Sequence, residues 1–219
     1  MSTLTSLNNE IIACRKCPRL VEWREEVARV KRKAYQDHES WGKPVPGFGD
    51  PNARVLVVGL APGAHGSNRT GRQFTGDASG NFLYPALHKA GFANQPTSES
   101  RSDGLRLNDM YITASGRCAP PDNKPSPEEL NNCQPFLMRE LEIIKPKVIV
   151  CLGKIAFDRI LKILAVRGLT FSHGAVYQLK TGHWLLCSYH PSQQNTSTKK
   201  LTLEMFDAIW VKAKELAER

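Results

Sequence analysis

The stretch RVLVVGLAPGAHGSNRTGRQFTGDASG, residues 54–80, decides the fold. Its apolar run at 55–58 is short, rich in β-branched residues and followed by Gly59 and Pro62, which is typical of a buried parallel strand. The glycine-rich loop behind it is long for a simple connector. Ligands of α/β proteins bind beyond the carboxyl end of such strands. We therefore expect this loop to form part of a binding site, although turn glycines on a plain surface loop would be the simpler interpretation.

In the rest of the chain, short apolar runs alternate with segments whose apolar residues recur every three or four positions, as in a helix. Further strands are predicted at 109–114, 147–152, 176–179 and 184–189, and helices at 1–13, 19–33, 80–90, 127–144, 154–164 and 200–217. The first two helices are expected to bury Leu4, Leu7, Ile11 and Ile12, and Leu20, Trp23, Val27 and Val30. Residues 34–53 and 92–107 are predicted to be irregular, with Ser79 capping the helix at 80–90. This order predicts one α/β domain over residues 1–219, with three α/β/α layers and a mainly parallel central sheet.

Composition and charge narrow the class of protein. With 41% apolar and 23% charged residues, the chain is typical of ordered globular proteins. No apolar run approaches the roughly 18 residues of a membrane helix, and no secretory signal is apparent, so we expect a cytoplasmic protein associated with the nucleoid. The net charge of +9 favours an anionic partner, chiefly nucleic acid. Basic clusters at 24–33 and 199–200 fit such a partner, or a solvated helix face.

Four of the six cysteines form a second pattern. Cys14 and Cys17 make a CxxC pair, and Cys118 and Cys133 follow far downstream. Four thiolates suit a tetrahedral zinc ion or a four-iron four-sulfur cluster, and in a reducing cytosol both are better interpretations than disulfides. The spacing does not choose between the metals, and four unrelated cysteines would be the simplest alternative. Cys151 and Cys187 lie in predicted strands, where buried small apolar side chains are expected.

Three loops are expected to meet at one edge of the sheet, because each follows the carboxyl end of an apolar strand. They carry His65, Phe74, Asp77, Asn123, His190 and Asn195. The set lacks a phosphate-binding Gly-Lys-Ser/Thr motif and a serine hydrolase arrangement. A ring for stacking, an amide and a histidine instead suit an extruded base. The alternatives are structural: Asp77 could cap a helix, Asn123 could be a turn residue and Phe74 could belong to the core.

Three motifs resemble those of the uracil-DNA glycosylases: GLAPG at 59–63, GRQFTGDASG at 71–80 and HPSQQNT at 190–196. The resemblance is strongest to the iron–sulfur, type B (family 5) branch and spans nearly the whole chain. It implies a uracil-DNA glycosylase fold and hydrolysis of the N-glycosidic bond of uracil in double-stranded DNA. It also implies activity on other deaminated bases such as hypoxanthine and xanthine, base flipping, a monomer, and a 4Fe-4S cluster rather than zinc on Cys14, Cys17, Cys118 and Cys133.

The resemblance also implies roles for the loop residues. Phe74 would stack on the flipped base, and His190 would stabilise the departing uracil anion at O2. Ala61, Gly63 and His65 would line the base pocket, and Ser192, Gln193 and Asn195 would hold the DNA backbone.

The chain departs from many relatives in its first motif. Leu60 and Ala61 stand where those relatives carry an acid or amide, and Ala114 stands where the type A branch carries a base-reading asparagine. Asp77 is therefore the candidate catalytic carboxylate and Asn123 the candidate reader of the uracil edge. Two other classes remain open from the sequence: a non-catalytic iron–sulfur or zinc module that binds damaged DNA, and a hydrolase of free nucleosides, against which the basic charge argues.

Overall fold

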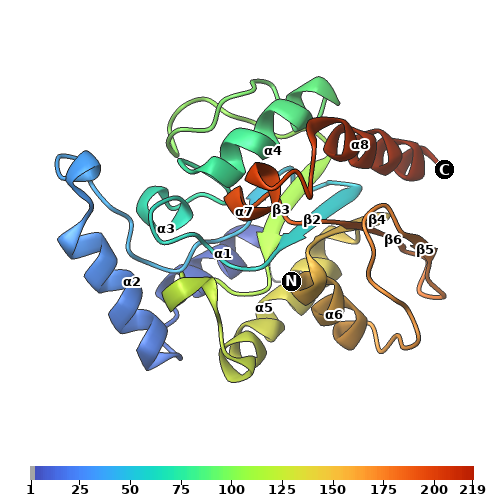
Figure 1. Ribbon diagram of the computed structural model, residues 1–219. Helices are drawn as coiled ribbons and strands as arrows, with labels where there is room; N and C mark the ends of the chain where they lie inside the picture. The colour runs from blue at the N-terminus through green and yellow to red at the C-terminus, as the bar shows by residue number, and fades with distance from the viewer. Residues whose placement is uncertain (1–2) are drawn as a thin grey trace.

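The computed structural model describes residues 3–219 and contains one six-stranded sheet between layers of helices (Figure 1). The strands are β1 (Phe48–Gly49), β2 (Val55–Gly59), β3 (Met110–Ala114), β4 (Val148–Leu152), β5 (Val176–Gln178) and β6 (Trp184–Ser188). The longer helices are α1 (Leu4–Ala13), α2 (Pro18–Val30), α4 (Ala78–Lys89), α5 (Pro127–Ile144), α6 (Lys154–Ile163) and α8 (Leu203–Glu218). The shorter ones are α3 (Ser67–Thr70), α7 (Gln193–Ser197) and the 3-10 helices η1 (Lys33–Tyr35) and η2 (Pro121–Asn123).

The sheet has the order β1-β3-β2-β4-β6-β5, and its four central strands are parallel. β2 pairs with β3 from Val55–Met110 to Gly59–Ala114, and the edge strands β1 and β5 are antiparallel to their neighbours. Every residue of β2, β3 and β4 is buried, as expected where helices cover both faces. The carboxyl ends of these strands therefore share one edge, from which the glycine-rich loop leaves.

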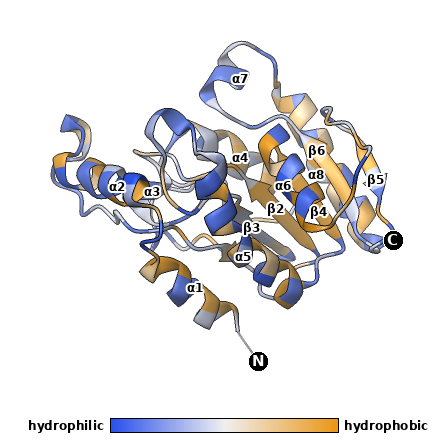
Figure 2. Ribbon diagram, turned by 90° about the horizontal axis from the view of Figure 1, so that it is seen from below, coloured by the Kyte–Doolittle hydropathy of each residue, from blue (hydrophilic) through white to orange (hydrophobic). Residues whose placement is uncertain are grey.

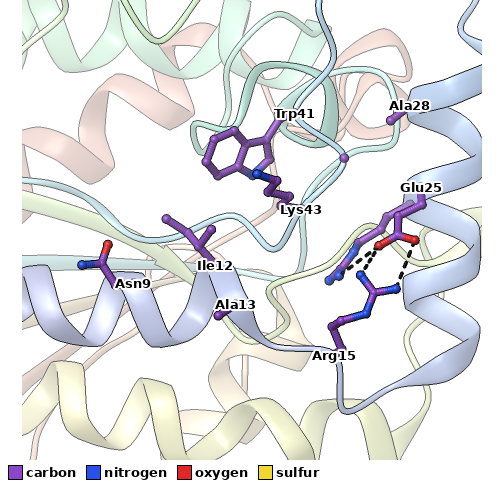
Figure 3. Close-up of a pocket in the computed structure, with 10 residues that line it drawn as sticks. Asn9, Ile12, Ala13, Arg15, Glu25, Ala28, Trp41 and Lys43 are labelled. Carbon is purple, nitrogen blue, oxygen red and sulfur yellow. Dashed lines mark hydrogen bonds and ion pairs between the residues drawn. The ribbon is translucent and has the colours of Figure 1, made fainter.

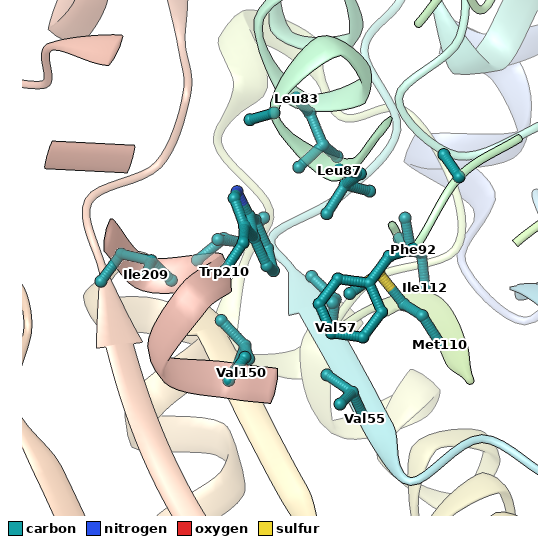
Figure 4. Close-up of a cluster of buried hydrophobic side chains, with 14 of the residues drawn as sticks. Val55, Val57, Leu83, Leu87, Phe92, Met110, Ile112, Val150, Ile209 and Trp210 are labelled. Carbon is teal, nitrogen blue, oxygen red and sulfur yellow. The ribbon is translucent and has the colours of Figure 1, made fainter. Parts of the chain in front are cut away.

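Two separate cores lie on the two faces of the sheet, which confirms the predicted three-layer α/β/α fold. On one face, Leu87 of α4 and Trp210 of α8 pack over Val57 and Val150 (Figure 4). On the other face, α5 and α6 cover β2 and β4. The strands are the most consistently apolar part of the ribbon, and the helices carry polar outer faces (Figure 2). Within residues 3–219, no helix combines the length and apolarity that a membrane crossing requires.

The predicted strands and long helices are confirmed to within a few residues, except that residues 1–2 of the first predicted helix lie outside the described residues. The short elements were missed. β1 lies inside residues 34–53, α3 lies inside the glycine-rich loop, and α7 lies inside the HPSQQNT motif, so the last helix begins only at Leu203. Elements of two to five residues are too short to show a periodic pattern. The expected cap at Ser79 was wrong: α4 begins earlier, and Asp77 is its N-cap.

The expected buried faces of the first two helices were partly wrong. Ile12 is only partly buried, and Trp23 and Val30 of α2 are exposed, at 37% and 58%. α2 instead buries a face that includes Leu20 and Arg24. The reason lies outside the helix, because α2 packs against the segment that carries Cys118, where a polar side chain finds a partner.

Candidate active site

The ends of β2 and β3 are joined by backbone hydrogen bonds. The amide of Ser115 donates to the carbonyl of Gly59 at 2.9 Å, and that of Gly116 donates to Leu60 at 2.8 Å. A Cβ atom added to Gly116 would lie 3.5 Å from the Cβ of Ala61. The first motif therefore lies directly against the loop that follows β3, as the parallel strands predict.

Phe74 and His190 bring the glycine-rich loop together with the loop after β6. Their ring centroids are 5.7 Å apart and their planes are tilted by 33°. Phe74 is 7% exposed and adopts a φ of 51°, a backbone conformation that non-glycine residues rarely take. Two glycines make room for it: a Cβ on Gly59 would lie 3.0 Å from the phenyl ring, and one on Gly80 would lie 1.9 Å from the Phe74 carbonyl. The loop thus holds this ring against the end of β2.

Asp77 has two different environments, one at each carboxylate oxygen. Oδ1 accepts a hydrogen bond from the amide of Gly80 at 3.0 Å and caps α4, so the capping alternative is confirmed. Oδ2 faces the start of the loop, where a Cβ on Gly63 or Gly66 would lie 3.0 Å or 1.9 Å from it. Burial raises the pKa of Asp77 above its usual value, while the capping amides and the charge of Arg69 oppose that rise. Capping uses one oxygen and leaves the other at the candidate site.

His190 is partly buried at the end of the β6 strand. Burial lowers the pKa of its imidazole to about 4, so the ring is neutral near neutral pH. No side chain or backbone group of residues 3–219 forms a hydrogen bond with the ring. A neutral imidazole carries one N–H donor. His190 can therefore offer this donor to a ligand that lies against Phe74.

The lowered pKa of His190 makes stability depend on pH. Between pH 6.5 and about 4, the unfolded chain binds a proton at this residue that the folded chain does not. The contribution of His190 to the free energy of unfolding is therefore fully present above pH 6.5 and is lost as the pH falls toward about 4. We expect the free energy of unfolding to fall by about 2 kcal/mol more in the wild type than in His190→Gln between about pH 7 and pH 4.5. Urea unfolding of both proteins measures this difference, and equal losses would contradict the prediction.

The HPSQQNT motif forms the short helix α7 and uses part of its polar groups internally. Ser192 caps the helix through a hydrogen bond from the Asn195 amide at 3.4 Å. The side-chain amide of Asn195 donates to the carbonyl of His190 at 2.8 Å. Gln193 is exposed. Asn195 therefore positions the His190 loop, and the side chains of Gln193 and Gln194 and the Ser192 hydroxyl are available to a partner.

In the described part of the chain, neither His65 nor Asn123 forms a ring contact or a side-chain hydrogen bond with Phe74 or His190. His65 is near the end of α2, where burial and the charges of Arg32 and Arg69 lower the pKa of its imidazole. Asn123 is exposed at the end of η2 with a φ of 56°, which agrees with its interpretation as a turn residue. In residues 3–219, no hydrogen bond links the side chain of Asn123 to the other candidates.

The four predicted cysteines line one cavity between α2, α5 and the loop after β3. Its wall contains Cys14, Cys17, Cys118 and Cys133 together with the apolar side chains of Leu20, Val21 and Pro44. In the described residues, no three Cys, His, Asp or Glu side chains converge closely enough for one metal ion. Burial raises the pKa of Cys118 to about 12 and also raises that of Cys133. Cys151 and Cys187 are fully buried in strands, as expected.

Polar side chains also line this cavity, among them Arg24 and Asn132, which the sequence did not place there. Nη1 of Arg24 donates to Sγ of Cys118 at 2.8 Å, and Nδ2 of Asn132 donates to Sγ of Cys17 at 3.4 Å. Arg24 is 1% exposed, and its nearest carboxylate is that of Glu25 at 3.7 Å. Glu25 is itself paired with Arg15 at the adjoining groove, as Figure 3 shows. Because this buried guanidinium has no close carboxylate partner, it favours negative charge on the neighbouring thiols.

The cavity suits a group that binds thiolates. Four sulfur donors are present, two of them receive N–H hydrogen bonds, and Leu20, Val21 and Pro44 supply an apolar part of the wall. Thiolates without a bound metal would be costly here, because burial opposes the ionisation of Cys118 and Cys133. The donor set therefore fits the group implied by the resemblance.

Comparisons with known proteins agree with these features. The profile of the uracil DNA glycosylase superfamily matches residues 46–214. The chain is 55% identical over 210 residues to a type-5 uracil-DNA glycosylase of Thermus thermophilus, which covers 94% of this chain and 95% of that protein. It is 52% identical over 220 residues to a type-5 uracil-DNA glycosylase of Mycobacterium leprae, over 98% and 96% of the two chains. A type-4 uracil-DNA glycosylase of Archaeoglobus fulgidus is 33% identical over 200 residues, which cover 88% of this chain and 83% of that protein.

The matched region extends from before β2 into α8 and so contains the whole parallel sheet. It includes the glycine-rich loop with Phe74 and Asp77, and the loop with His190. The match to the Mycobacterium leprae relative covers 98% of the chain and so includes the segment with Cys14 and Cys17. The chain therefore belongs to the uracil-DNA glycosylase superfamily and, within it, resembles the type-5 branch that its motifs predict.

Proposed function

We propose that the protein hydrolyses the N-glycosidic bond of uracil in DNA and leaves an abasic site. The observation that supports this best is the pair of Phe74 and His190 at the carboxyl edge of the sheet: a held aromatic ring beside an imidazole without a hydrogen-bond partner in residues 3–219. An aromatic face and a polar donor are what recognition of a flipped base requires.

In this proposal, the uracil leaves the duplex and stacks on Phe74. The N–H of neutral His190 donates to uracil O2, where negative charge develops as the glycosidic bond lengthens. Asp77 stabilises the cationic sugar or orients the attacking water with Oδ2, while Oδ1 continues to cap α4. Asn123 reads the uracil edge. Because its side chain is exposed, this role requires the bound DNA to reach η2.

We also propose a substrate range that includes hypoxanthine and xanthine. Leu60, Ala61 and Ala114 offer no polar side chain next to the base, so the pocket lacks groups that would reject other deaminated bases. The missing side chain of Gly63 lets Asp77 Oδ2 lie close to the start of the loop. His65, two residues further along the same loop, is proposed to contact the base from that side. The Ser192 hydroxyl and Gln193 hold DNA phosphates, and Asn195 supports them through the His190 carbonyl. The protein is expected to act as a monomer in the cytoplasm, at the nucleoid that holds its DNA substrate.

A further part of the proposal is a 4Fe-4S cluster held by Cys14, Cys17, Cys118 and Cys133. When bound, it would cross-link the N-terminal segment to the loop after β3 and so brace the chain as one domain. Arg24 and Asn132 would donate hydrogen bonds to its cysteine sulfurs.

Replacing Cys118 by serine should abolish the visible absorption of the purified protein, reduce its iron content and lower its melting temperature, because one of four sulfur ligands is lost. Cys151→Ser is the matched control, since Cys151 is also buried but lies in β4 outside the cavity. Absorption spectra, metal analysis and thermal melting provide the readouts. A wild-type protein that contains zinc and no visible band would contradict the cluster.

Incubation with a duplex that contains one uracil, followed by alkali, tests the proposed activity. Only a glycosylase leaves an abasic site that alkali converts to a strand break at the uracil position. Strand breaks with hypoxanthine and xanthine duplexes would support the broad range. Binding of the duplex without any break would instead support a non-catalytic module that recognises damaged DNA.

A further inference from the structure

A cluster of positive side chains lies where α2 ends. Lys31 leaves the helix with a φ of 56°, and the exposed side chains of Arg32 and Lys33 follow it. Neither Arg32 nor Lys33 forms an ion pair within residues 3–219. Other cations of α2 differ in this respect, since Arg29 pairs with Glu26 on the same helix. The positive charge at this end of α2 is therefore available to a partner.

This end of α2 is attached to the glycine-rich loop of the active site. The guanidinium of Arg69 lies 4.0 Å from the ring centroid of Tyr35. The same side chain donates to the carbonyls of His65 and Gly76, at 2.9 Å and 3.1 Å, and so joins two distant points of the loop. A shallow cavity has Arg32, Tyr35, His65 and Arg69 in its wall. We refer to Arg32, Lys33, His65 and Arg69 as the basic corner.

Backbone contacts hold the basic corner rigidly beside the site. The amide of Trp41 donates to the carbonyl of Arg69 at 2.8 Å, and the side chain of Asn68 donates to the carbonyl of Arg24 in α2 at 3.1 Å. α2 and α3 accordingly lie next to each other in Figure 1. The loop continues from the corner to Gly76 and Asp77, so phosphates bound here would lie close to the extruded nucleotide.

Positive charge prevails at the corner. Among the described residues, no acidic side chain lines the cavity at the corner. Asp37 and Glu39 are exposed on the connection after η1, and Asp77 is close enough to Arg69 for their charges to interact. In the described residues, neither Asp37 nor Glu39 forms an ion pair with the corner. After burial, the charges of Arg32 and Arg69 are the next causes of the lowered pKa of His65. An anion that approaches the corner would relieve this repulsion.

We propose that the basic corner binds the DNA phosphate backbone next to the extruded nucleotide, on the α2 side of the site. This inference rests on the proposed function, because it takes DNA as the partner. The groups offered by α7 are neutral, so they do not neutralise phosphates. Cations that neutralise phosphates release counterions and make affinity depend on salt. The corner therefore adds salt-dependent affinity to the neutral contacts that α7 offers.

The test compares the double variant Arg32→Gln/Lys33→Gln with Arg167→Gln/Lys180→Gln. The control removes the same two residue types at exposed positions that follow α6 and β5, near the opposite edge of the sheet. Fluorescence anisotropy measures binding of a duplex with an uncleavable abasic-site analogue over a range of salt concentrations. We expect the corner variant to bind about tenfold more weakly at low salt, with a slope of log affinity against log salt that is smaller by about 2.

The control variant should keep the wild-type slope to within about half a unit. Both variants change only exposed side chains, and equal melting temperatures would show that both are folded. An unchanged slope in the corner variant, or equal changes in both variants, would overturn the proposal. The alkali assay on the wild type keeps the two proposals apart. If the wild type excises uracil but the corner variant keeps the wild-type salt slope, only the proposal for the basic corner is refuted. If the salt slope changes but the wild type excises no uracil, only the glycosylase activity is refuted.

Discussion

Replacement of Asp77 by asparagine is expected to lower the single-turnover rate of uracil release by at least about 100-fold. Asparagine keeps an oxygen that can accept the Gly80 hydrogen bond, so the cap of α4 survives and the melting temperature should change little. What disappears is the negative charge on Oδ2, next to Gly63 and Gly66. Rapid-quench measurement with enzyme in excess over a uracil duplex reports the chemical step directly.

Asp77→Ala separates the two roles of this side chain. It removes both the charge and the cap, so it should match the rate loss of Asp77→Asn and in addition cost about 1 kcal/mol of stability, or about 2–4 °C in melting temperature. Near wild-type release by Asp77→Asn would mean that Asp77 is only a cap. Asn123→Ala is expected to lower the rate separately, and the double variant Asp77→Ala/Asn123→Ala to lower it much further. A double variant close to the wild type would exclude both residues from the chemistry.

Replacement of His190 by alanine is the second change with a large expected effect. Loss of a single hydrogen-bond donor to a developing oxyanion lowers rates by about 100-fold or more. The imidazole has no hydrogen-bond partner in residues 3–219, and no charge at neutral pH. Its contribution therefore arises when the uracil anion forms, rather than when DNA binds. Single-turnover rates should fall by about this factor, while the dissociation constant for the duplex changes far less.

Two further measurements test whether His190 acts as a hydrogen-bond donor. His190→Gln keeps an N–H group and should recover part of the rate lost in His190→Ala. Because the pKa of His190 is about 4, the wild-type rate should show no step from this residue between about pH 6 and pH 8. A variant that loses affinity but keeps its rate would show that His190 only holds DNA.

The sequence alone was sufficient to predict the parallel strands and the side of the sheet where their carboxyl ends meet. The runs at 55–58 and 148–152 are apolar throughout, and that at 110–114 is apolar apart from Thr113, because helices cover both faces; this signal is local. The spacing of Cys14 and Cys17 marks one wall of the cysteine cavity. Ser126 and Glu129 form the predicted start of α5 as a capping box. Each of these features depends on a few residues that are neighbours in the chain.

Only the tertiary structure decided which polar side chains face a partner and which face the protein. Arg24 has the pattern of a solvated cation, yet it is buried because Cys118, 94 residues away, accepts its hydrogen bond. Asn195 has the pattern of a DNA contact, yet its amide supports the carbonyl of His190. Asp77 is both a cap and a candidate carboxylate, because its two oxygens meet different segments. Burial and pairing of such groups depend on residues distant in the chain, and periodicity along the chain carries no information about them.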